Sequence, residues 1–309
     1  MGSPNGLWTS VSGGMAQSQN VDIIANNLAN ANTTGFKKDE PTFKEYLTTN
    51  ERPPSPAIDI PRTAFKDSDF YHFDGREHAM VNLNKVVTDH TQGSMRSTSA
   101  PFDMAIDGPG FFAVQTPSGM MFTRSGDFKV NGQGQLVNQE GYPVLGLAGE
   151  AADAENQPKP GGTADAARNP SSFNPFTGQY PPVDGSKPLL APINLKDPIA
   201  AGTVIHISPE GELFSGDERV AKIAMAEFAN PILLKKETTS LYSNPDAANV
   251  PRVGDSSRVR QGFLEASNVN PVVELMNLIK ANRMYESNMR AIKAYNDMSA
   301  KEANEVGKL

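Results

Sequence analysis

The sequence has no cysteine among its 309 residues. Disulfide bonds, thiolate catalysis and thiolate metal sites are therefore excluded, and the chain tolerates either redox compartment. Tryptophan occurs once and aromatic residues make up 7% of the chain, whereas 26 glycines and 24 prolines are present. These proportions predict a chain with many turns and a modest core.

Long apolar runs are missing as well. No stretch approaches the ~18 residues that a membrane-spanning helix needs, and the first residues lack the basic and apolar regions of a signal peptide. The formal net charge of −7 argues against nucleic acid as a partner. We therefore expect no membrane insertion, no cleavable signal peptide and no nucleic-acid binding.

Charge is nearly absent from the N-terminal segment, where Asp22 is the only ionisable side chain before Lys37. Apolar and small residues nevertheless recur there at alternating intervals of four and three, as in a coiled-coil seam. The seam consists of Leu7, Val11, Gly14, Ser18, Val21, Ala25 and Leu28, with Ile24 beside it. Gly13 and Gly14 weaken the predicted helix by about 1 kcal/mol each. Gly35 is expected to end it in a left-handed conformation.

Amides take the place of charges on this helix, at Asn20, Asn26, Asn27, Asn30 and Asn32. A solvent-facing helix usually carries lysine and glutamate, so the pattern indicates a helix packed on more than one side. Alone it would fray, because a short apolar stripe returns less free energy than ordering the helix costs. Ordinary helix-surface amides are the alternative interpretation.

The middle of the chain divides into four segments by composition. Residues 37–100 indicate an extended or irregular connection, with Phe43, Tyr46 and Leu47 as a short amphipathic extension and a candidate strand at Val81–Val87. Closely spaced turns in residues 101–147 predict the first part of a small antiparallel β domain. Residues 148–188, rich in glycine, proline and asparagine, indicate an exposed loop insertion. Strands resume in residues 189–264, apart from an irregular region at Leu233–Val253.

A second long helix is predicted near the C-terminus, with Asn270 as N-cap and Pro271 as its first residue. Its apolar band consists of Val272, Leu275, Met276, Leu278, Ile279, Tyr285, Met289 and Ile292. The simplest interpretation is packing against the N-terminal helix of the same chain. Packing shared between subunits is the alternative.

The sequence contains no constellation of catalytic residues that we can identify. The four histidines are scattered, without the spacing of metal ligands. The glycine-rich turn at Asp107–Gly110 precedes a predicted strand rather than a phosphate-binding helix. We therefore expect no enzyme activity, no metal and no cofactor.

Several stretches resemble the axial proteins of the bacterial flagellum, the family of rod, hook and hook-associated proteins. They are Ala25–Asn30 with Thr33–Lys37, Asp103–Phe112 with Phe122–Phe128, Gly134–Gly146, and Gly262–Asn270 followed by Met276–Tyr285. They occur in the family's order along most of the chain. Ser267–Val272 and the tail at residues 301–305 look most like the proximal rod type. Asp22–Asn27 leans towards the distal rod type, which is the alternative.

The resemblance implies an α+β fold in which residues 1–36 and 265–309 pair as a discontinuous coiled-coil domain around the export channel of the rod. The mostly antiparallel β domain would form an outer layer. A structural subunit is implied, which leaves the cytoplasm through the flagellar type III export apparatus. It would assemble in the periplasmic basal body with its own copies and neighbouring rod proteins, and transmit torque. A hook-type subunit, or a secreted binding module or wall-modifying enzyme carried by the β domain, is the alternative.

The residues that we expect at the assembly interface come from both ends of the chain. They are Leu7, Val11, Val21, Ile24, Asn26, Asn27, Leu28, Asn30, Gly35, Phe36, Glu265, Ser267, Asn268, Val269, Asn270, Met276, Ile279, Tyr285, Met289 and Ile292. Some of them have a local alternative. Gly35 and Phe36 suit a helix stop, and residues 265–270 suit capping and turn hydrogen bonds.

Overall fold

The computed structural model describes residues 5–47, 79–147, 190–196, 203–254 and 256–306. The chain divides into two compact units, each built from segments far apart in the sequence. Unit 1 comprises residues 1–28, 39–87 and 270–309, and unit 2 comprises residues 29–38 and 88–269. The insertion predicted at residues 148–188 lies outside the described residues.

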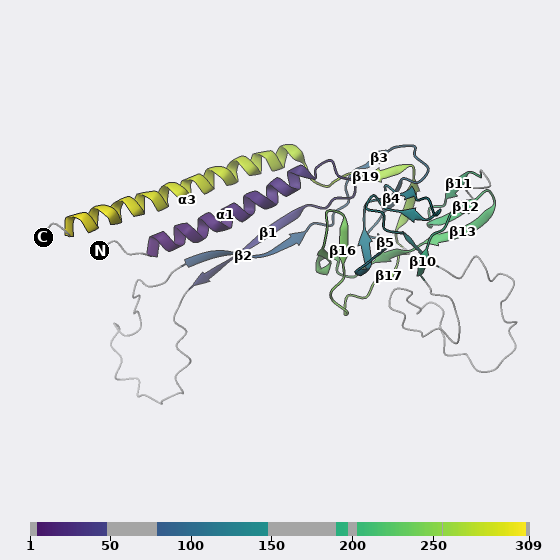
Figure 1. Ribbon diagram of the computed structural model, residues 1–309, viewed down its shortest axis with the longest axis horizontal. Coiled ribbons are helices and arrows are strands. Elements are labelled where there is room, and N and C mark those ends of the chain that lie inside the picture. Colours follow the sequence, from purple (N-terminus) through teal and green to yellow (C-terminus); the bar gives the residue numbers. More distant parts are fainter. Residues whose placement is uncertain (1–4, 48–78, 148–189, 197–202, 255, 307–309) are drawn as a thin grey trace, which may run out of the picture. The chain divides into compact units, whose positions relative to one another are not determined.

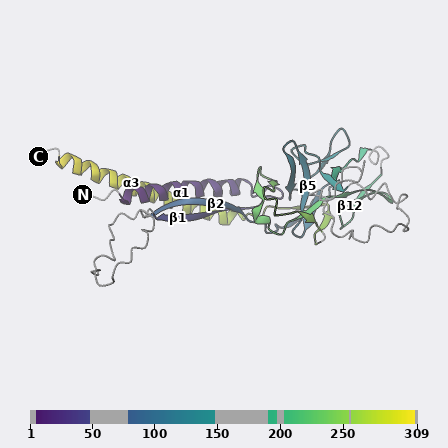
Figure 2. The ribbon, with the colours of Figure 1, turned by 90° about the horizontal axis from the view of Figure 1, so that it is seen from below.

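In its described residues, unit 1 contains two helices and a two-stranded sheet, which can be followed in Figure 1. Helix α1 spans Asn5–Ala29 and helix α3 spans Pro271–Val306. The two helices run side by side in opposite directions (Figures 1 and 2). The sheet pairs β1 (Asp39–Leu47) with β2 (Ala79–Thr88). The helices predicted near both ends of the chain, and the strand predicted at residues 81–87, are thus confirmed.

Helix α3 begins as the sequence predicts. Oδ1 of Asn270 accepts hydrogen bonds from the N–H groups of Val272 (3.1 Å) and Val273 (3.3 Å). These bonds satisfy two of the donors that a helix start leaves open. Pro271 brings no such donor, because its nitrogen carries no hydrogen.

Strand β1 replaces the short amphipathic extension that we predicted from Phe43, Tyr46 and Leu47. Proline at position 41 would cost a helix interior about 3 kcal/mol. A strand is also stabilised here by its neighbour β2, where the carbonyl of Lys85 accepts a hydrogen bond from Oγ1 of Thr42 at 2.6 Å. The helix-like spacing of Phe43, Tyr46 and Leu47 therefore predicted the wrong secondary structure for this short segment.

Unit 2 is a β region whose described strand pairs are antiparallel. One sheet has the order β15-β16-β6-β5-β14-β17 and another has the order β10-β9-β13-β12-β11. Three pairs, β4–β18, β3–β19 and β7–β8, complete the described strands. The bounds are β3 Met95–Ser97, β4 Met104–Asp107, β5 Phe111–Thr116, β6 Gly119–Thr123, β7 Lys129–Val130, β8 Leu136–Val137, β9 Leu145–Leu147, β10 Leu190–Pro192, β11 Ile205–Ile207, β12 Glu212–Ser215, β13 Glu218–Ile223, β14 Met225–Glu227, β15 Lys235–Lys236, β16 Leu241–Ser243, β17 Arg252–Val253, β18 Arg258–Gln261 and β19 Phe263–Glu265.

Strand β5 is buried on both faces. Phe112 and Val114 join one apolar cluster, and Phe111 and Ala113 join a second. Because both faces are covered, the strand forms a continuous apolar run instead of alternating with polar residues. The hairpin predicted from the turn before Gly119 is confirmed, since β5 pairs with β6.

The region predicted to be irregular, Leu233–Val253, is more regular than we expected. It contains strands β15, β16 and β17, and it follows a short 3₁₀ turn at Pro231–Leu233. These strands are two or three residues long. An alternating pattern cannot show itself over so few residues, so pairing within the sheet decides their conformation.

Candidate assembly site

Gly35 fixes the path of the chain that follows α1. Its φ of +65° confirms the left-handed conformation predicted for it. A Cβ at this position would lie 2.4 Å from the nitrogen of Ser125 and 2.5 Å from the carbonyl carbon of Arg124. The N–H of Gly35 donates a hydrogen bond to the carbonyl of Glu265 at 2.8 Å. Only glycine meets both the conformational and the steric requirement.

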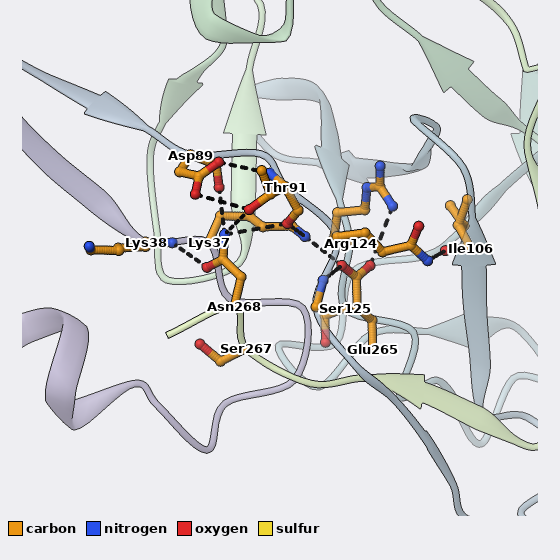
Figure 3. A network of polar contacts seen from close by, with 12 residues as sticks. Lys37, Lys38, Asp89, Thr91, Ile106, Arg124, Ser125, Glu265, Ser267 and Asn268 are labelled. Carbon is orange, nitrogen blue, oxygen red and sulfur yellow. Dashed lines mark hydrogen bonds and ion pairs between the residues drawn. The ribbon is translucent and has the colours of Figure 1, made fainter. Parts of the chain in front are cut away.

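A buried ion cluster lies in unit 2 (Figure 3), and the backbone of two of its residues, Arg124 and Glu265, lies against Gly35. It consists of Lys37, Arg124 and Glu265, whose side chains are 0%, 3% and 0% exposed. Nζ of Lys37 is ion-paired with Oε1 of Glu265, and Nη1 of Arg124 lies 3.3 Å from Oε2. One carboxylate faces two cations, so the ion cluster carries an excess positive charge.

Backbone groups supply further partners to the ion cluster. Nζ of Lys37 donates to the carbonyl of Thr91 at 2.7 Å, and Nη2 of Arg124 donates to the carbonyl of Gly108 at 2.7 Å. Oε1 of Glu265 accepts a hydrogen bond from the N–H of Gly93 at 2.9 Å. Such partners are needed because a buried charge without hydrogen bonds costs several kcal/mol.

Burial lowers the pKa values of both cations in the ion cluster. Burial lowers the pKa of Lys37 below its ordinary value of 10.5, against the attraction of Glu265, and Arg124 adds repulsion. The half-buried Asp89 opposes this shift. Burial also lowers the pKa of Arg124, again against the attraction of Glu265.

Asn268 joins the same three segments a few residues further on (Figure 3). Its Oδ1 accepts a hydrogen bond from the N–H of Lys38 at 2.8 Å, and its Nδ2 donates to the carbonyl of Asp89 at 2.9 Å. Its own N–H donates to the carbonyl of Phe36 at 3.4 Å. Segments 35–38, 89–93 and 265–268 are thereby fastened together within unit 2.

Arg124, Thr91 and Gly93 are not among the predicted site residues, and Lys37 is part of the sequence prediction only as the last residue of the stretch Thr33–Lys37. A signal for Arg124 exists, because a charged residue follows directly on an apolar strand within the stretch Phe122–Phe128. The backbone contacts of residues 91 and 93 depend on tertiary structure and have no sequence signal. The buried residues Phe36 and Glu265 make internal contacts of one chain.

In unit 1, the two helices meet where Gly13 and Gly14 of α1 face Asn288 of α3. A Cβ on Gly13 would lie 3.5 Å from Nδ2 of Asn288, and a Cβ on Gly14 would lie 3.8 Å from its Cβ. Buried or half-buried residues of α3 recur at alternating intervals of four and three through this contact. They are Glu274, Leu278, Ala281, Tyr285, Asn288, Ile292 and Tyr295. The spacing is typical of a coiled-coil seam.

Much of the apolar band of α3 does not pack within the described chain, contrary to the simplest prediction. Leu275, Met276 and Ile279 are 49%, 55% and 45% exposed, and Val272 and Met289 are exposed as well. The reason is that the first two turns of α3 are apolar on almost every side. The face that carries Leu278 can be covered by α1, but the opposite face cannot be covered at the same time.

The remaining predicted interface residues fall into four groups. Ile24, Asn27 and Val269 are buried; Val11, Val21, Leu28, Asn30 and Ser267 are half-buried; Asn26 and Asn270 are exposed; and the side chain of Leu7 lies outside the description. Asn27 has an internal role. Its Nδ2 donates to the carbonyl of Asp39 at 2.8 Å, and its Oδ1 accepts from the N–H of Asp39 at 3.0 Å.

The part of the chain that the structure describes contains neither a candidate membrane span nor a candidate metal site. No described helix is both long enough and apolar enough to cross a membrane. Among the same residues, no three histidine, aspartate or glutamate side chains are grouped so that they could hold a metal ion.

Three family models match successive parts of the chain. They are described as "Flagella basal body rod protein" (residues 7–37), "Flagellar hook protein FlgE/F/G D1 domain" (residues 105–214) and "Flagellar basal body rod FlgEFG protein C-terminal" (residues 260–306). The first of these regions includes Gly35, and the last includes Glu265 and Asn288.

Relatives of both rod types cover nearly the whole chain. The flagellar basal-body rod protein FlgF of Caulobacter vibrioides is 29% identical over 99% of this chain and 99% of its own length. The rod protein FlgG of Buchnera aphidicola subsp. Acyrthosiphon pisum is 31% identical over 96% and 97%, respectively. FlgG of Bacillus subtilis is 30% identical over 93% of both chains.

Proposed function

The chain belongs to the flagellar basal-body rod protein family, and we propose that it polymerises into the rod through its terminal helices. It is a structural subunit of the rod. The observation that carries the proposal is the exposed apolar face at the start of α3, around Val272, Met276 and Ile279. Covering such side chains contributes roughly 1–2 kcal/mol each, and many repeated copies of one weak contact produce a stiff polymer.

Helix α1 fits the same proposal. Its outer side has almost no charge, and the exposed residues there include Trp8, Met15 and Asn26. An uncharged surface loses little hydration energy when another protein covers it. We propose that residues 1–36 and 265–309 form a coiled-coil inner domain around the export channel, with the β region as an outer layer.

Export and location follow from this assembly role. We propose that the subunit passes through the flagellar type III export apparatus and reaches the periplasmic part of the basal body. There it would contact copies of itself and neighbouring rod proteins, and transmit torque. A terminal helix that is weak on its own supports this route, because it stays unfolded at little cost and gains stability only among neighbours.

We propose the proximal rod type, FlgF, in preference to the distal type, FlgG. The support is the stretch Ser267–Val272 and the tail at residues 301–305, whereas Asp22–Asn27 favours the distal type. Expression of this chain in strains that lack either rod protein tests the choice. We expect swimming to return only in the strain without its proximal rod protein. Rescue of the other strain alone would contradict the subtype.

The assembly proposal is tested by Ile279→Asp. The residue is already 45% exposed, so the free energy of unfolding of the isolated chain should change by less than about 0.5 kcal/mol. Incorporation into purified basal bodies, measured by immunoblot, should be lost because a charge would be buried between subunits.

Asn282→Asp is the matched control, since residue 282 is exposed on α3 and receives the same charge. It should retain incorporation. If the Ile279→Asp chain enters rods at the normal level, the exposed start of α3 is not part of the assembly interface.

A truncation separates assembly from the alternatives. Residues 1–28 belong to unit 1, whereas Gly35, Phe36 and Lys37 are buried in unit 2. Deletion of residues 1–28 should therefore abolish rod assembly and leave unit 2 folded. A binding or wall-modifying activity that survives this deletion would favour the module or enzyme interpretation instead.

A further inference from the structure

The pair Gly13–Gly14 interrupts the seam of α1 and lowers its helix propensity, yet the helix continues through both residues. The structure shows neighbours on two sides of α1 at this level. Asn288 of α3 lies against both glycines. On strand β2, the N–H of Val81 donates a hydrogen bond to Oγ of Ser12 at 3.3 Å. Gly13 and Gly14 bring no side chain of their own to the contact with Asn288.

We propose that Asn288 sets the axial register of α3 against α1, with the bare backbone of Gly13 and Gly14 as its seat. Asn288 occupies a position of the α3 seam where leucine would bury more apolar surface. A single polar residue at a seam position favours one register over others, at some cost in stability. Asn288 is thus a specificity-determining residue of the helix pair.

Neighbouring registers are worse for a steric and a polar reason. If α3 moved by one turn along α1, Asn288 would face Val11 or Ser18 instead of the glycine pair. Either side chain would occupy the space that Gly14 leaves open, so the helices would have to separate. Opposite Val11, the amide would also face an apolar side chain instead of the glycine backbone, which is less favourable for a polar group.

The register matters because it determines which residues of the two helices form one surface. Moving one helix by a turn displaces its side chains by about 5.4 Å. The exposed start of α3, with Met276 and Ile279, would then lie beside different residues of α1. This consequence for assembly rests on the proposed function, whereas the register itself is a property of one chain.

The register can be measured by cysteine cross-linking, because the natural sequence contains no cysteine. In an antiparallel pair with Gly14 opposite Asn288, Val21 lies opposite Ala281, and a shift of one turn places Val21 opposite Tyr285 instead. Val21→Cys with Ala281→Cys therefore reports the native register. Val21→Cys with Tyr285→Cys reports the shifted one.

The purified full-length protein is oxidised, and the disulfide within one chain is scored by gel mobility and peptide mass. We expect the native pair to form at least about 10-fold faster than the shifted pair, and Asn288→Leu to remove most of that preference. Asn296→Leu is the matched control, because it makes the same change at an exposed position of α3. It should leave the preference intact.

Two results would overturn the assignment: an unchanged preference in Asn288→Leu, or a chain with normal Asn288 in which neither pair forms. The seat is tested separately. A Cβ on Gly14 fits at 3.8 Å, so Gly14→Ala should keep the preference, whereas Gly14→Leu should lose it. If Gly14→Leu still forms the native cross-link in preference to the shifted one, the proposed role of the glycine pair in the register is refuted.

Incorporation into rods is then scored for the same variants in cells. If Asn288→Leu shifts the register of the purified chain but assembles normally, the link to assembly is refuted and the register assignment stands. If the natural chain itself never enters rods, the proposed function fails, while the cross-linking result is unaffected.

Discussion

The buried ion cluster of unit 2 and the helix pair of unit 1 differ in how far their side chains are buried within one chain. In the ion cluster, three charged side chains from distant parts of the sequence are almost wholly buried, and they bind one another and backbone groups, with Nε of Arg124 left without a hydrogen-bond partner. In the helix pair, Val272, Met276 and Ile279 remain exposed beside a seam that is only partly buried. One region is complete within a single chain, and the other leaves apolar surface uncovered.

The difference separates a region that is closed within one chain from the region that we propose for assembly. A closed polar cluster is rigid because any opening leaves charges without partners. A helix pair with one uncovered apolar side has little to lose when it opens alone, and much to gain beside another copy. The chain thus combines a β region with a buried, paired polar cluster and terminal helices for which we propose the assembly role.

The largest expected contrast is in amide exchange. The N–H groups of Gly35 and Lys38 are bonded within unit 2 and should exchange only on global unfolding. Those in the middle of α1 should exchange at least ~1,000-fold faster in the dilute monomer. Hydrogen exchange followed by mass spectrometry measures both in one sample. Equal protection of the two regions would break the comparison.

Glu265→Gln should have the largest effect on stability. The substitution preserves size but leaves the buried cations Lys37 and Arg124 without a carboxylate, which should lower the free energy of unfolding by about 3–5 kcal/mol. Urea denaturation followed by circular dichroism measures this. Glu286→Gln, in an ion pair that is 81% and 62% exposed, is the control and should cost less than about 0.5 kcal/mol. Similar losses for both variants would contradict the assignment.

Gly35→Ala should follow, with a loss of roughly 2–4 kcal/mol. The new methyl would combine an unfavourable positive φ with a contact of 2.4 Å to the backbone of Ser125. Gly132→Ala serves as the control, because a Cβ there meets no atom within 4 Å. Thermal unfolding of both variants decides the matter, and a stable Gly35→Ala would show that the segment can relax.

The smallest expected effect belongs to Lys37→Met. It removes one of two cations, and Glu265 keeps Arg124 as its partner. The free energy of unfolding should therefore fall much less than in Glu265→Gln. Folding lowers the pKa of Lys37 from 10.5. At pH values between the lowered pKa of the folded protein and 10.5, the unfolded chain binds more protons than the folded chain. The free energy of unfolding of the natural protein should therefore rise with pH in this range.

That rise should be weaker in Lys37→Met, by at most about 1.4 kcal/mol per pH unit. Urea denaturation at several alkaline pH values measures the slope, with the 65% exposed Lys235, changed to Met, as the control. An identical slope in the natural protein and Lys37→Met would refute a shifted Lys37.

The sequence by itself determined the elements whose signals are local. The N-cap at Asn270, the left-handed Gly35 and the β5–β6 hairpin each depend on a few neighbouring residues, and all three are as predicted. The helical periodicity and the missing charge of the N-terminal segment also predicted α1, because such a pattern repeats over many residues. Its predicted seam is covered only in part, since Ser18 and Ala25 are exposed.

Only the tertiary structure decided the rest. Strand β1 overrode a helix-like spacing because β2 supplies its partner, and three strands of two or three residues formed where no pattern was visible. Lys37 and Glu265 are separated by 228 residues, so no local rule could pair them. A contact between distant segments depends on how the whole chain closes, and the free energy that selects it appears only once the chain is folded.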